Sequence, residues 1–166
     1  MNYWRVIEID IEIEESASGP PVSKLKRAYT PLLAWKSAVK EDPLGILDTW
    51  VGSDVCSYKG VFCADSQGGP VVAGIDFNHA NLQGTLVKEL SFLTDMSLLH
   101  LNNNWFLGTI PDTFTDLSSL QELGLSNNLF SSPFPAPTLY IPNLVYLDIG
   151  FNKISGPLPE FWFHGF

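Results

Sequence analysis

A 24-residue internal repeat is the feature that most constrains how this chain folds. The segments "LHLNNNWFLGTIP" at 99–111, "LGLSNNLFSSPFP" at 123–135 and "LDIGFNKISGPLP" at 147–159 share one layout at a constant offset. The agreement holds at many columns at once, which distinguishes an internal repeat from chance spacing of leucines. Four apolar columns align: Ile75, Leu99, Leu123 and Leu147; Phe77, Leu101, Leu125 and Ile149; Val72, Met96, Leu120 and Leu144; Leu82, Phe106, Phe130 and Ile154.

The repeat predicts a solenoid. Units of roughly 20–29 residues with the pattern L-x-x-L-x-L-x-x-N-x-L are typical of leucine-rich repeats. The L-x-L alternation directs two side chains inward and the residue between them outward, so successive coils are expected to stack a short parallel β-sheet. No unit can bury its leucines alone, because each one contacts only its neighbours. We therefore expect about four stacked repeats over residues 71–160.

Each unit also carries polar and turn-forming residues at fixed positions. The column Asn104, Asn128 and Asn152 is expected inside the turn, where the amide both donates to and accepts from the backbone of adjacent coils; Ala80 stands there in the first unit. Glycine allows a tight bend and proline fixes the extended segment after it. These columns are Gly84, Gly108 and Gly156, then Pro111, Pro135 and Pro159, with departures at Val87 and Ser132.

The element L-x-G-x-[I/L]-P resembles the plant-specific subclass of leucine-rich repeats. The fold class expected from this resemblance is an α/β solenoid, a right-handed coil with a short parallel β-sheet and a helical N-terminal cap. Residues 24–70 would form that cap, because an open end of the solenoid would expose its core. Within it, Thr30 is expected as N-cap with Pro31 at the first helical position, and the helix ends at Asp42-Pro43. Its apolar face is Leu32, Trp35 and Val39, and a second helical turn runs through Ile46 and Leu47 toward Trp50.

Cys56 and Cys63 are the only cysteines in the chain, and six residues separate them. Buried free thiols, half of a metal site or a disulfide are the alternatives. Zinc normally takes four ligands, so two cysteines do not make a site. Their position between an amphipathic helix and the first repeat strand favours a disulfide that staples the cap.

The two ends of the chain differ from the repeats. Residues 1–23 are predicted to form an acidic arm and linker: Ile7, Ile9, Ile11 and Ile13 alternate with acidic residues, and "SASGPPVS" follows. The apolar tail 161–166 contains Phe161, Trp162, Phe163 and Phe166 where a covering unit is expected. We expect an uncovered C-terminal end of this kind to promote self-association.

Charge narrows the class of partner. The chain has 9 Lys+Arg against 18 Asp+Glu. This acidic balance disfavours nucleic acid and anionic membranes as partners, whereas basic ligands remain possible. No apolar run reaches the roughly 18 residues that a membrane span needs. Residues 71–166 contain eight acidic side chains against Lys88 and Lys153 only. The sequence contains no phosphate-binding loop or metal-ligand set, so no cofactor or metal is expected.

Outward-facing positions around the strands define the candidate binding surface. The predicted ligand-binding residues are Asp76, Asn78, His100, Asn102, Glu122, Ser126, Tyr146, Asp148 and Phe151. Asp76 and His100 on adjacent strands are expected to pair, which raises the hypothesis of a catalytic dyad. No nucleophile is well placed beside them, so a surface hydrogen-bonded pair is the better interpretation. Trp105 is expected to pack on the convex side rather than contact a ligand.

The segments "DVCSYKGVFC", "VVAGIDFNHANLQGTL" and "LTDMSLLHLNNN" resemble the leucine-rich repeat extensins, over roughly residues 24–160. The cysteine segment fits the form W-x(n)-C-x-[WY]-x-G-V-x-C that recurs in plant extracellular caps. The resemblance implies a secreted cell-wall protein that binds small, basic, cysteine-rich signalling peptides. Signal peptide, further repeats and a Ser-Pro-rich tail are missing from the sequence, and this indicates a truncated product or fragment.

The resulting prediction is a non-enzymatic extracellular, cell-wall recognition module. It would bind a basic signalling peptide, or a cell-wall protein or polysaccharide, through the concave face of the solenoid, in wall assembly or growth sensing. One alternative is a module like the polygalacturonase-inhibiting proteins, which block a secreted pectin hydrolase. Another is a truncated product with no independent function.

Overall fold

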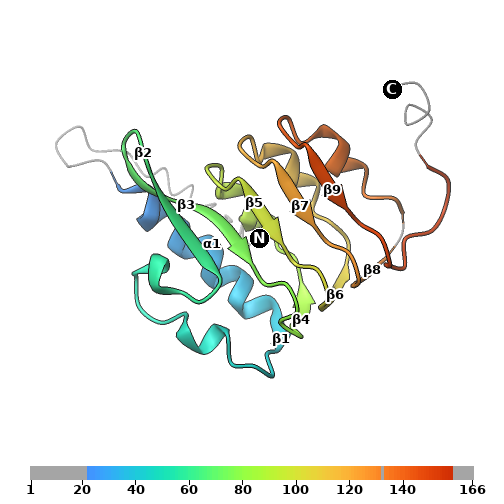
Figure 1. The fold of residues 1–166 in the computed structure, drawn as a ribbon, viewed down its shortest axis with the longest axis horizontal. Coiled ribbons are helices and arrows are strands. Elements are labelled where there is room, and N and C mark those ends of the chain that lie inside the picture. The colour runs from blue at the N-terminus through green and yellow to red at the C-terminus, as the bar shows by residue number, and fades with distance from the viewer. Residues whose placement is uncertain (1–21, 132, 159–166) are drawn as a thin grey trace, which may run out of the picture.

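The computed structural model describes residues 22–131 and 133–158, which form a stack of coils with a helix across one end (Figure 1). The solenoid predicted from the repeat is confirmed. The helices are α1 (Lys24–Ala38) and the short 3-10 helices η1 (Leu47–Thr49), η2 (Val55–Ser57), η3 (Lys88–Phe92), η4 (Asp112–Asp116) and η5 (Ala136–Tyr140). The strands are β1 (Val39–Glu41), β2 (Val61–Ser66), β3 (Gly69–Asp76), β4 (Gln83–Thr85), β5 (Leu98–His100), β6 (Trp105–Gly108), β7 (Glu122–Gly124), β8 (Leu129–Phe130) and β9 (Tyr146–Asp148).

The main sheet has the order β2-β3-β5-β7-β9. Its strands β3, β5, β7 and β9 are parallel, and their register places the predicted column Ile75, Leu99, Leu123 and Leu147 side by side. The first three of these side chains are completely buried and Leu147 is half-buried. The 24-residue spacing in the sequence is therefore the distance along the chain from one strand of this sheet to the next.

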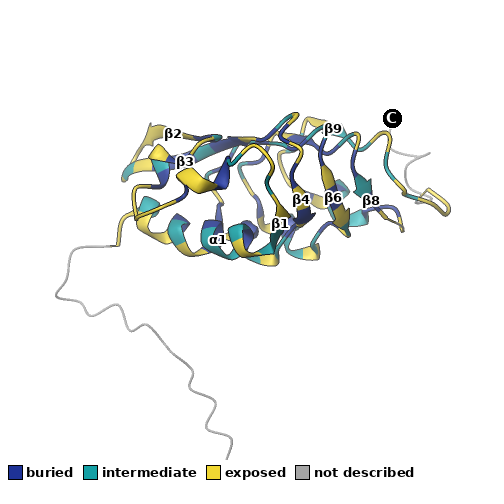
Figure 2. Ribbon diagram, turned by 90° about the horizontal axis from the view of Figure 1, so that it is seen from below, coloured by how far each residue is buried: buried dark blue, intermediate teal, exposed yellow. Residues whose placement is uncertain are grey.

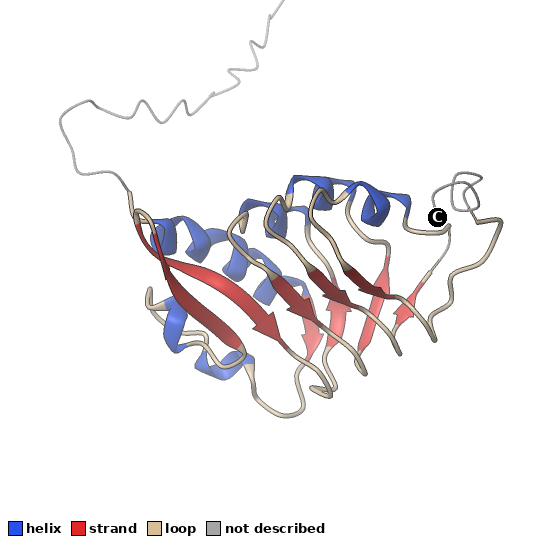
Figure 3. Ribbon diagram, turned by 45° about the horizontal axis from the view of Figure 1, so that its top comes forward, coloured by secondary structure: helices blue, strands red, loops and turns tan. Residues whose placement is uncertain are grey.

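A second sheet, which the sequence pattern does not predict, lies on another side of the coils (Figure 3). Its order is β1-β4-β6-β8, with β1 antiparallel to β4 and the others parallel. Gly84 shares a repeat column with the turn glycines, but it allows a close approach of two strands and does not form a left-handed turn. A Cβ on Gly84 would lie 2.4 Å from the Ala38 carbonyl oxygen, so glycine allows β1 to approach. Gly108 does adopt a left-handed conformation, with φ of 85°.

The asparagine column carries out the predicted role of pairing buried backbone groups between coils. Asn104 Nδ2 donates to the carbonyl oxygens of Phe77 at 2.8 Å and Leu101 at 3.0 Å, while its Oδ1 accepts from Leu82 N at 2.9 Å. One coil later, Asn128 Nδ2 donates to Leu101 O and Asn128 Oδ1 accepts from Phe106 N. In the next coil, Asn152 Nδ2 donates to Leu125 O and Asn152 Oδ1 accepts from Phe130 N. Each amide thus joins its own turn to the preceding coil.

The cap helix begins and ends earlier than predicted. It ends at Ala38, so Val39 lies in β1 and not on the helix face, and the predicted end at Asp42-Pro43 is wrong. Ser23 is the N-cap, and its side chain accepts a hydrogen bond from Lys26 N, so the assignment of Thr30 as N-cap is wrong. Pro31 lies inside the helix and is buried with Ala28 and Leu32. Burial at this helical spacing favours a helix that continues through the proline, and it outweighs the local start signal at Thr30.

Aromatic rings connect the cap to the coils. Trp35 of α1 packs against Trp50, with ring centroids 6.2 Å apart, and stacks on Phe106 of the second coil at 5.9 Å. Phe106 in turn stacks on Phe130 at 6.4 Å. Residues coloured as buried occur both in the cap and in the successive coils (Figure 2). The cap therefore shares one continuous apolar core with the repeats.

The predicted disulfide is present between Cys56 and Cys63. Cys63 lies on β2, which forms an antiparallel hairpin with β3. The boundary drawn at 70/71 between cap and repeats falls within β3, so the cap supplies the first strand of the main sheet. The predicted acidic arm and linker at 1–23, apart from Val22 and Ser23, and the apolar tail 161–166 lie outside the described residues. Self-association through the C-terminal end remains a prediction.

Substitution of a buried ladder asparagine tests the role of the column. We expect Asn104→Ala to lower the free energy of unfolding by about 2–4 kcal/mol, because it leaves buried backbone groups of two coils unpaired. Asn143→Ala is the control: this exposed amide donates to Ser118 O at 2.6 Å, and its loss is expected to cost less than about 1 kcal/mol. Urea unfolding of the two variants measures the difference, and equal losses would show that the ladder is unimportant.

Candidate functional site

The outward side of the main sheet, here called the main-sheet face, presents two rows of side chains across the strands. One row follows the register Phe62, Gly74, Leu98, Glu122 and Tyr146. The other is Asp76, His100, Gly124 and Asp148. The structure thus brings together five of the predicted site residues: Asp76, His100, Glu122, Tyr146 and Asp148.

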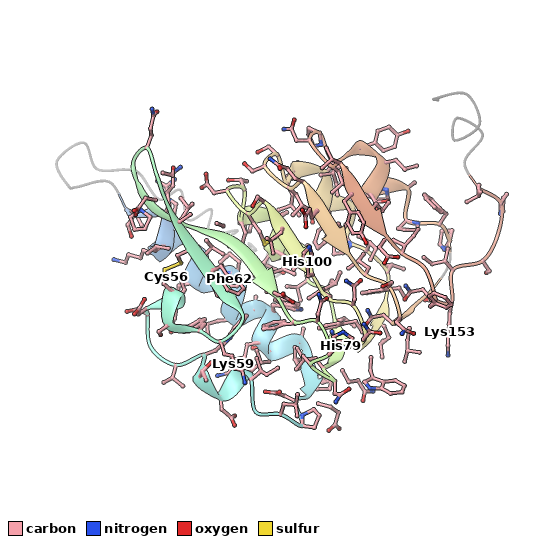
Figure 4. All side chains as sticks on the ribbon, in the orientation of Figure 1. Cys56, Lys59, Phe62, His79, His100 and Lys153 are labelled. Carbon is pink, nitrogen blue, oxygen red and sulfur yellow. A yellow bond between two sulfur atoms is a disulfide. The ribbon has the colours of Figure 1, made fainter. Side chains whose placement is uncertain are left out.

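Phe62 is a member of this surface that the sequence analysis missed. It is 55% exposed and lies opposite Gly74 in the β2–β3 hairpin (Figure 4). Leu98 leans over Gly74, since a Cβ there would lie 2.7 Å from Leu98 Cγ. Phe62 and Leu98 therefore give the row an apolar end. The alternation of Val61, Phe62 and Cys63 was the available signal, but the repeat register does not extend to β2.

His100 pairs with Glu122 and not with the expected partner, Asp76. His100 Nε2 lies 2.8 Å from Glu122 Oε2, on the neighbouring strand in the opposite direction. Asp76 Oδ1 accepts from Asn78 N at 2.9 Å, and Asp148 Oδ1 accepts from Gly150 N at 3.1 Å in the equivalent place three repeats later. A carboxylate that caps its own turn in this way is held away from the imidazole. The pairing predicted for Asp76 and His100 is therefore wrong.

Asn78, Asn102 and Ser126 connect coils at the ends of the strands. Asn78 Oδ1 accepts from Asn102 N at 2.8 Å, and Asn102 Oδ1 accepts from both the backbone N and the hydroxyl of Ser126. Gly124 leaves room for this, because a Cβ there would lie 2.6 Å from Asn102 Nδ2. The side-chain amide oxygens of Asn78 and Asn102 and the hydroxyl of Ser126 already have protein partners. These three residues therefore serve chiefly to hold neighbouring strands of the main-sheet face together.

The arrangement gives no support to the catalytic hypothesis. A hydrolytic dyad needs a nucleophile within hydrogen-bond reach of the imidazole. The nearest hydroxyl by register, that of Ser126, donates to an amide oxygen, whereas His100 contacts a carboxylate. Within residues 22–131 and 133–158, no group of three His, Cys, Asp or Glu side chains is arranged to hold a metal ion.

Phe151 stands apart in conformation. It belongs to the column His79, Asn103, Asn127 and Phe151, whose members all have positive φ, between 53° and 61°. Asparagine tolerates this left-handed region, whereas a bulky aromatic residue there is strained. Phe151 is nevertheless 86% exposed, so no packing of its ring offsets the strain. The structure therefore shows a strained, solvent-exposed aromatic side chain at this position.

Comparisons with known proteins agree with this geometry. The family model described as "Leucine rich repeat N-terminal domain" matches residues 29–64, and that described as "Leucine Rich Repeat" matches residues 96–117 and 143–164. The chain carries the leucine-rich repeat fold. The first family model matches the cap of this leucine-rich repeat domain, and the second matches two of its coils.

Curated relatives of the domain include extensin-like proteins. Leucine-rich repeat extensin-like protein 2 of Arabidopsis thaliana is 52% identical over 92 residues, which are 54% of this chain and 12% of that protein. Pollen-specific leucine-rich repeat extensin-like protein 1 of the same plant is 49% identical over 102 residues, 60% of this chain and 10% of that protein. The chain thus spans a small part of the length of these relatives.

Solved structures show the same fold in plant receptors. The PEPR1–AtPEP1 structure has a TM-score of 0.73 at 30% identity and covers 81% of this chain and 19% of the other. The Arabidopsis receptor kinase HAESA, in complex with the peptide hormone IDA and the co-receptor SERK1, has a TM-score of 0.69 at 28% identity. The match covers 80% of this chain and 22% of the HAESA chain. In the part of this chain that the structure describes, no helix is long and apolar enough to cross a membrane.

Relief of strain at Phe151 is measurable. We expect Phe151→Asn to raise the free energy of unfolding by about 0.5–1 kcal/mol, because asparagine tolerates the left-handed conformation better. Tyr146→Asn is the control, since Tyr146 is a half-exposed aromatic residue in a regular strand, where asparagine is disfavoured. The measurement is chemical denaturation. A Phe151→Asn variant that is no more stable than the parent would contradict the assignment of strain.

Proposed function

We propose that this leucine-rich repeat domain is an extracellular recognition module that binds a basic peptide across the main-sheet face. The observation that carries the proposal is the composition of the two rows. Asp76, Glu122 and Asp148 place three carboxylates on the face, and none of the row positions holds Lys or Arg. Complementary charge directs a cationic partner to such a surface and selects against anionic ones.

The spacing of the rows indicates what the peptide presents. Asp76 and Asp148 are separated by three strand-to-strand steps, or about 14 Å at the usual sheet spacing. An extended peptide that crosses the strands advances by about 3.3 Å per residue, so two basic side chains about four residues apart would reach both carboxylates. An apolar side chain at one end would lie on Phe62 and Leu98. Tyr146 and Phe151 offer aromatic contacts at the other end.

The relatives support both the location and the class of ligand. PEPR1 was solved with AtPEP1, and HAESA was solved with the peptide hormone IDA. The extensin-like relatives and the disulfide in the cap favour an extracellular, cell-wall setting for this chain as well. A non-enzymatic binding role agrees with the use of the His100 and Ser126 side chains described above.

A charge reversal on the face tests the proposal. The probe is a synthetic basic, cysteine-rich peptide of the rapid alkalinisation factor type, titrated calorimetrically at near-physiological salt. We expect the parent to bind with micromolar or tighter affinity and Asp148→Lys to weaken binding by about ten-fold or more. Asp116→Lys makes the same charge change on η4, away from the face, and is expected to have little effect because salt screens distant charges.

Three results would overturn the proposal. One is the absence of binding by the parent, and another is an equal loss in both variants, which would indicate only general attraction between opposite net charges. The third is unchanged affinity in Asp148→Lys. Inhibition of a polygalacturonase by a parent that binds no peptide would support the inhibitor alternative instead.

A further inference from the structure

A hollow of about 270 Å³ lies beside the main-sheet face, at the turns that lead into the second sheet. Five of the seven residues around it are asparagines and the other two are Trp105 and Leu129, so its wall is uncharged. The three carboxylates of the main-sheet face, Asp76, Glu122 and Asp148, do not line the hollow. The lining therefore offers hydrogen bonds and apolar contact without a charge that would select an ionic ligand.

Successive coils hold the amides of the hollow in a fixed ladder. Asn127 Nδ2 donates to Asn103 Oδ1 at 2.6 Å, and Asn103 Nδ2 lies 3.4 Å from His79 Nε2. All three residues share the left-handed backbone conformation. His79 marks this edge of the coils in Figure 4. Side chains fixed before binding lose little conformational entropy when a ligand arrives.

The hollow also offers hydrogen-bonding groups without protein partners. Across the described residues, 22–131 and 133–158, no such partner contacts the Asn81 amide, Asn127 Oδ1 or Trp105 Nε1. Amides both donate and accept, which matches the dual character of a hydroxyl group. Trp105 is 55% exposed although it belongs to β6, so one side of the indole remains open.

We infer that this hollow binds a neutral oligosaccharide of β-linked pyranoses. The C–H groups of a pyranose ring carry partial positive charge and stack on the negative face of an indole. Its hydroxyls pair with the amides of Asn81 and Asn127. The coils repeat at about 4.8 Å, close to the advance of one sugar in an extended chain, so consecutive sugars meet consecutive coils. Trp105 is predicted from the sequence to pack on the convex side, so the repeat pattern alone does not reveal this site.

The test is a titration of the 15N-labelled chain with cellohexaose, followed by NMR. The signals to observe are the Trp105 indole N–H, assigned by its loss in Trp105→Phe, and the side-chain amides of Asn81, Asn103 and Asn127. We expect saturable shifts at these groups with a dissociation constant of about 1 mM or tighter. Trp105→Ala is expected to weaken binding about ten-fold or more.

Leu107→Ala is the matched control, because Leu107 is exposed on the same strand and does not line the hollow. It is expected to bind cellohexaose like the parent. Absence of shifts at Trp105, undiminished binding in Trp105→Ala, or an equal loss in Leu107→Ala would overturn the inference. Asp148→Lys is expected to keep cellohexaose binding while it weakens peptide binding, so this site and the main-sheet face succeed or fail separately.

Discussion

Contact between equivalent coils is the interaction on which the rest of this structure depends. Leu99, Leu123 and their equivalents are buried because the next coil covers them, and not because any one coil forms a core. The asparagine ladder solves the accompanying problem of polar backbone inside the turns. Each amide pairs groups from two coils, so apolar burial and hydrogen bonding require the same register.

The cap follows from the same requirement. A stack of coils has open ends, and Trp35 and Trp50 close one of them with aromatic rings that continue the inner column of the repeats. The cap does more than cover the end, since its strand β2 extends the main sheet by one position. That extension places Phe62 and Leu98 on either side of Gly74 and gives the candidate binding surface its apolar end.

The repeat allowed much of the fold to be predicted from sequence. The strand register, the inward columns and the ladder asparagines could be predicted because one pattern recurs and each copy supports the others. The disulfide is predicted from a different signal, the position of the two cysteines between the cap helix and the first repeat strand. Features that occur once could not be read in this way. β1 and β2 have no equivalents in other coils. The helix α1 begins at the N-cap Ser23 and runs through Pro31, whereas the local signal at Thr30-Pro31 predicts a later start.

The candidate site was predictable only in outline for a related reason. Alternation along a strand specifies which residues face outward, and it found Asp76, His100, Glu122, Tyr146 and Asp148. It does not specify which neighbour a side chain contacts. His100 joins Glu122 because Asp76 is held by its own turn, and that choice depends on backbone N–H groups with no distinctive sequence signal. The hollow at Trp105 likewise forms only when three coils are stacked.

The central claim, that the coils are stacked in register, is tested most directly by backbone hydrogen exchange. The amides of Phe77, Leu101 and Leu125 donate to the carbonyl oxygens of His100, Gly124 and Asp148 on the next coil, at 2.7–2.8 Å. Stacked coils predict slow exchange at all three amides, which lie 24 residues apart in the sequence. Exchange at the rate of an unfolded chain at these positions, with protection confined to α1, would contradict the account.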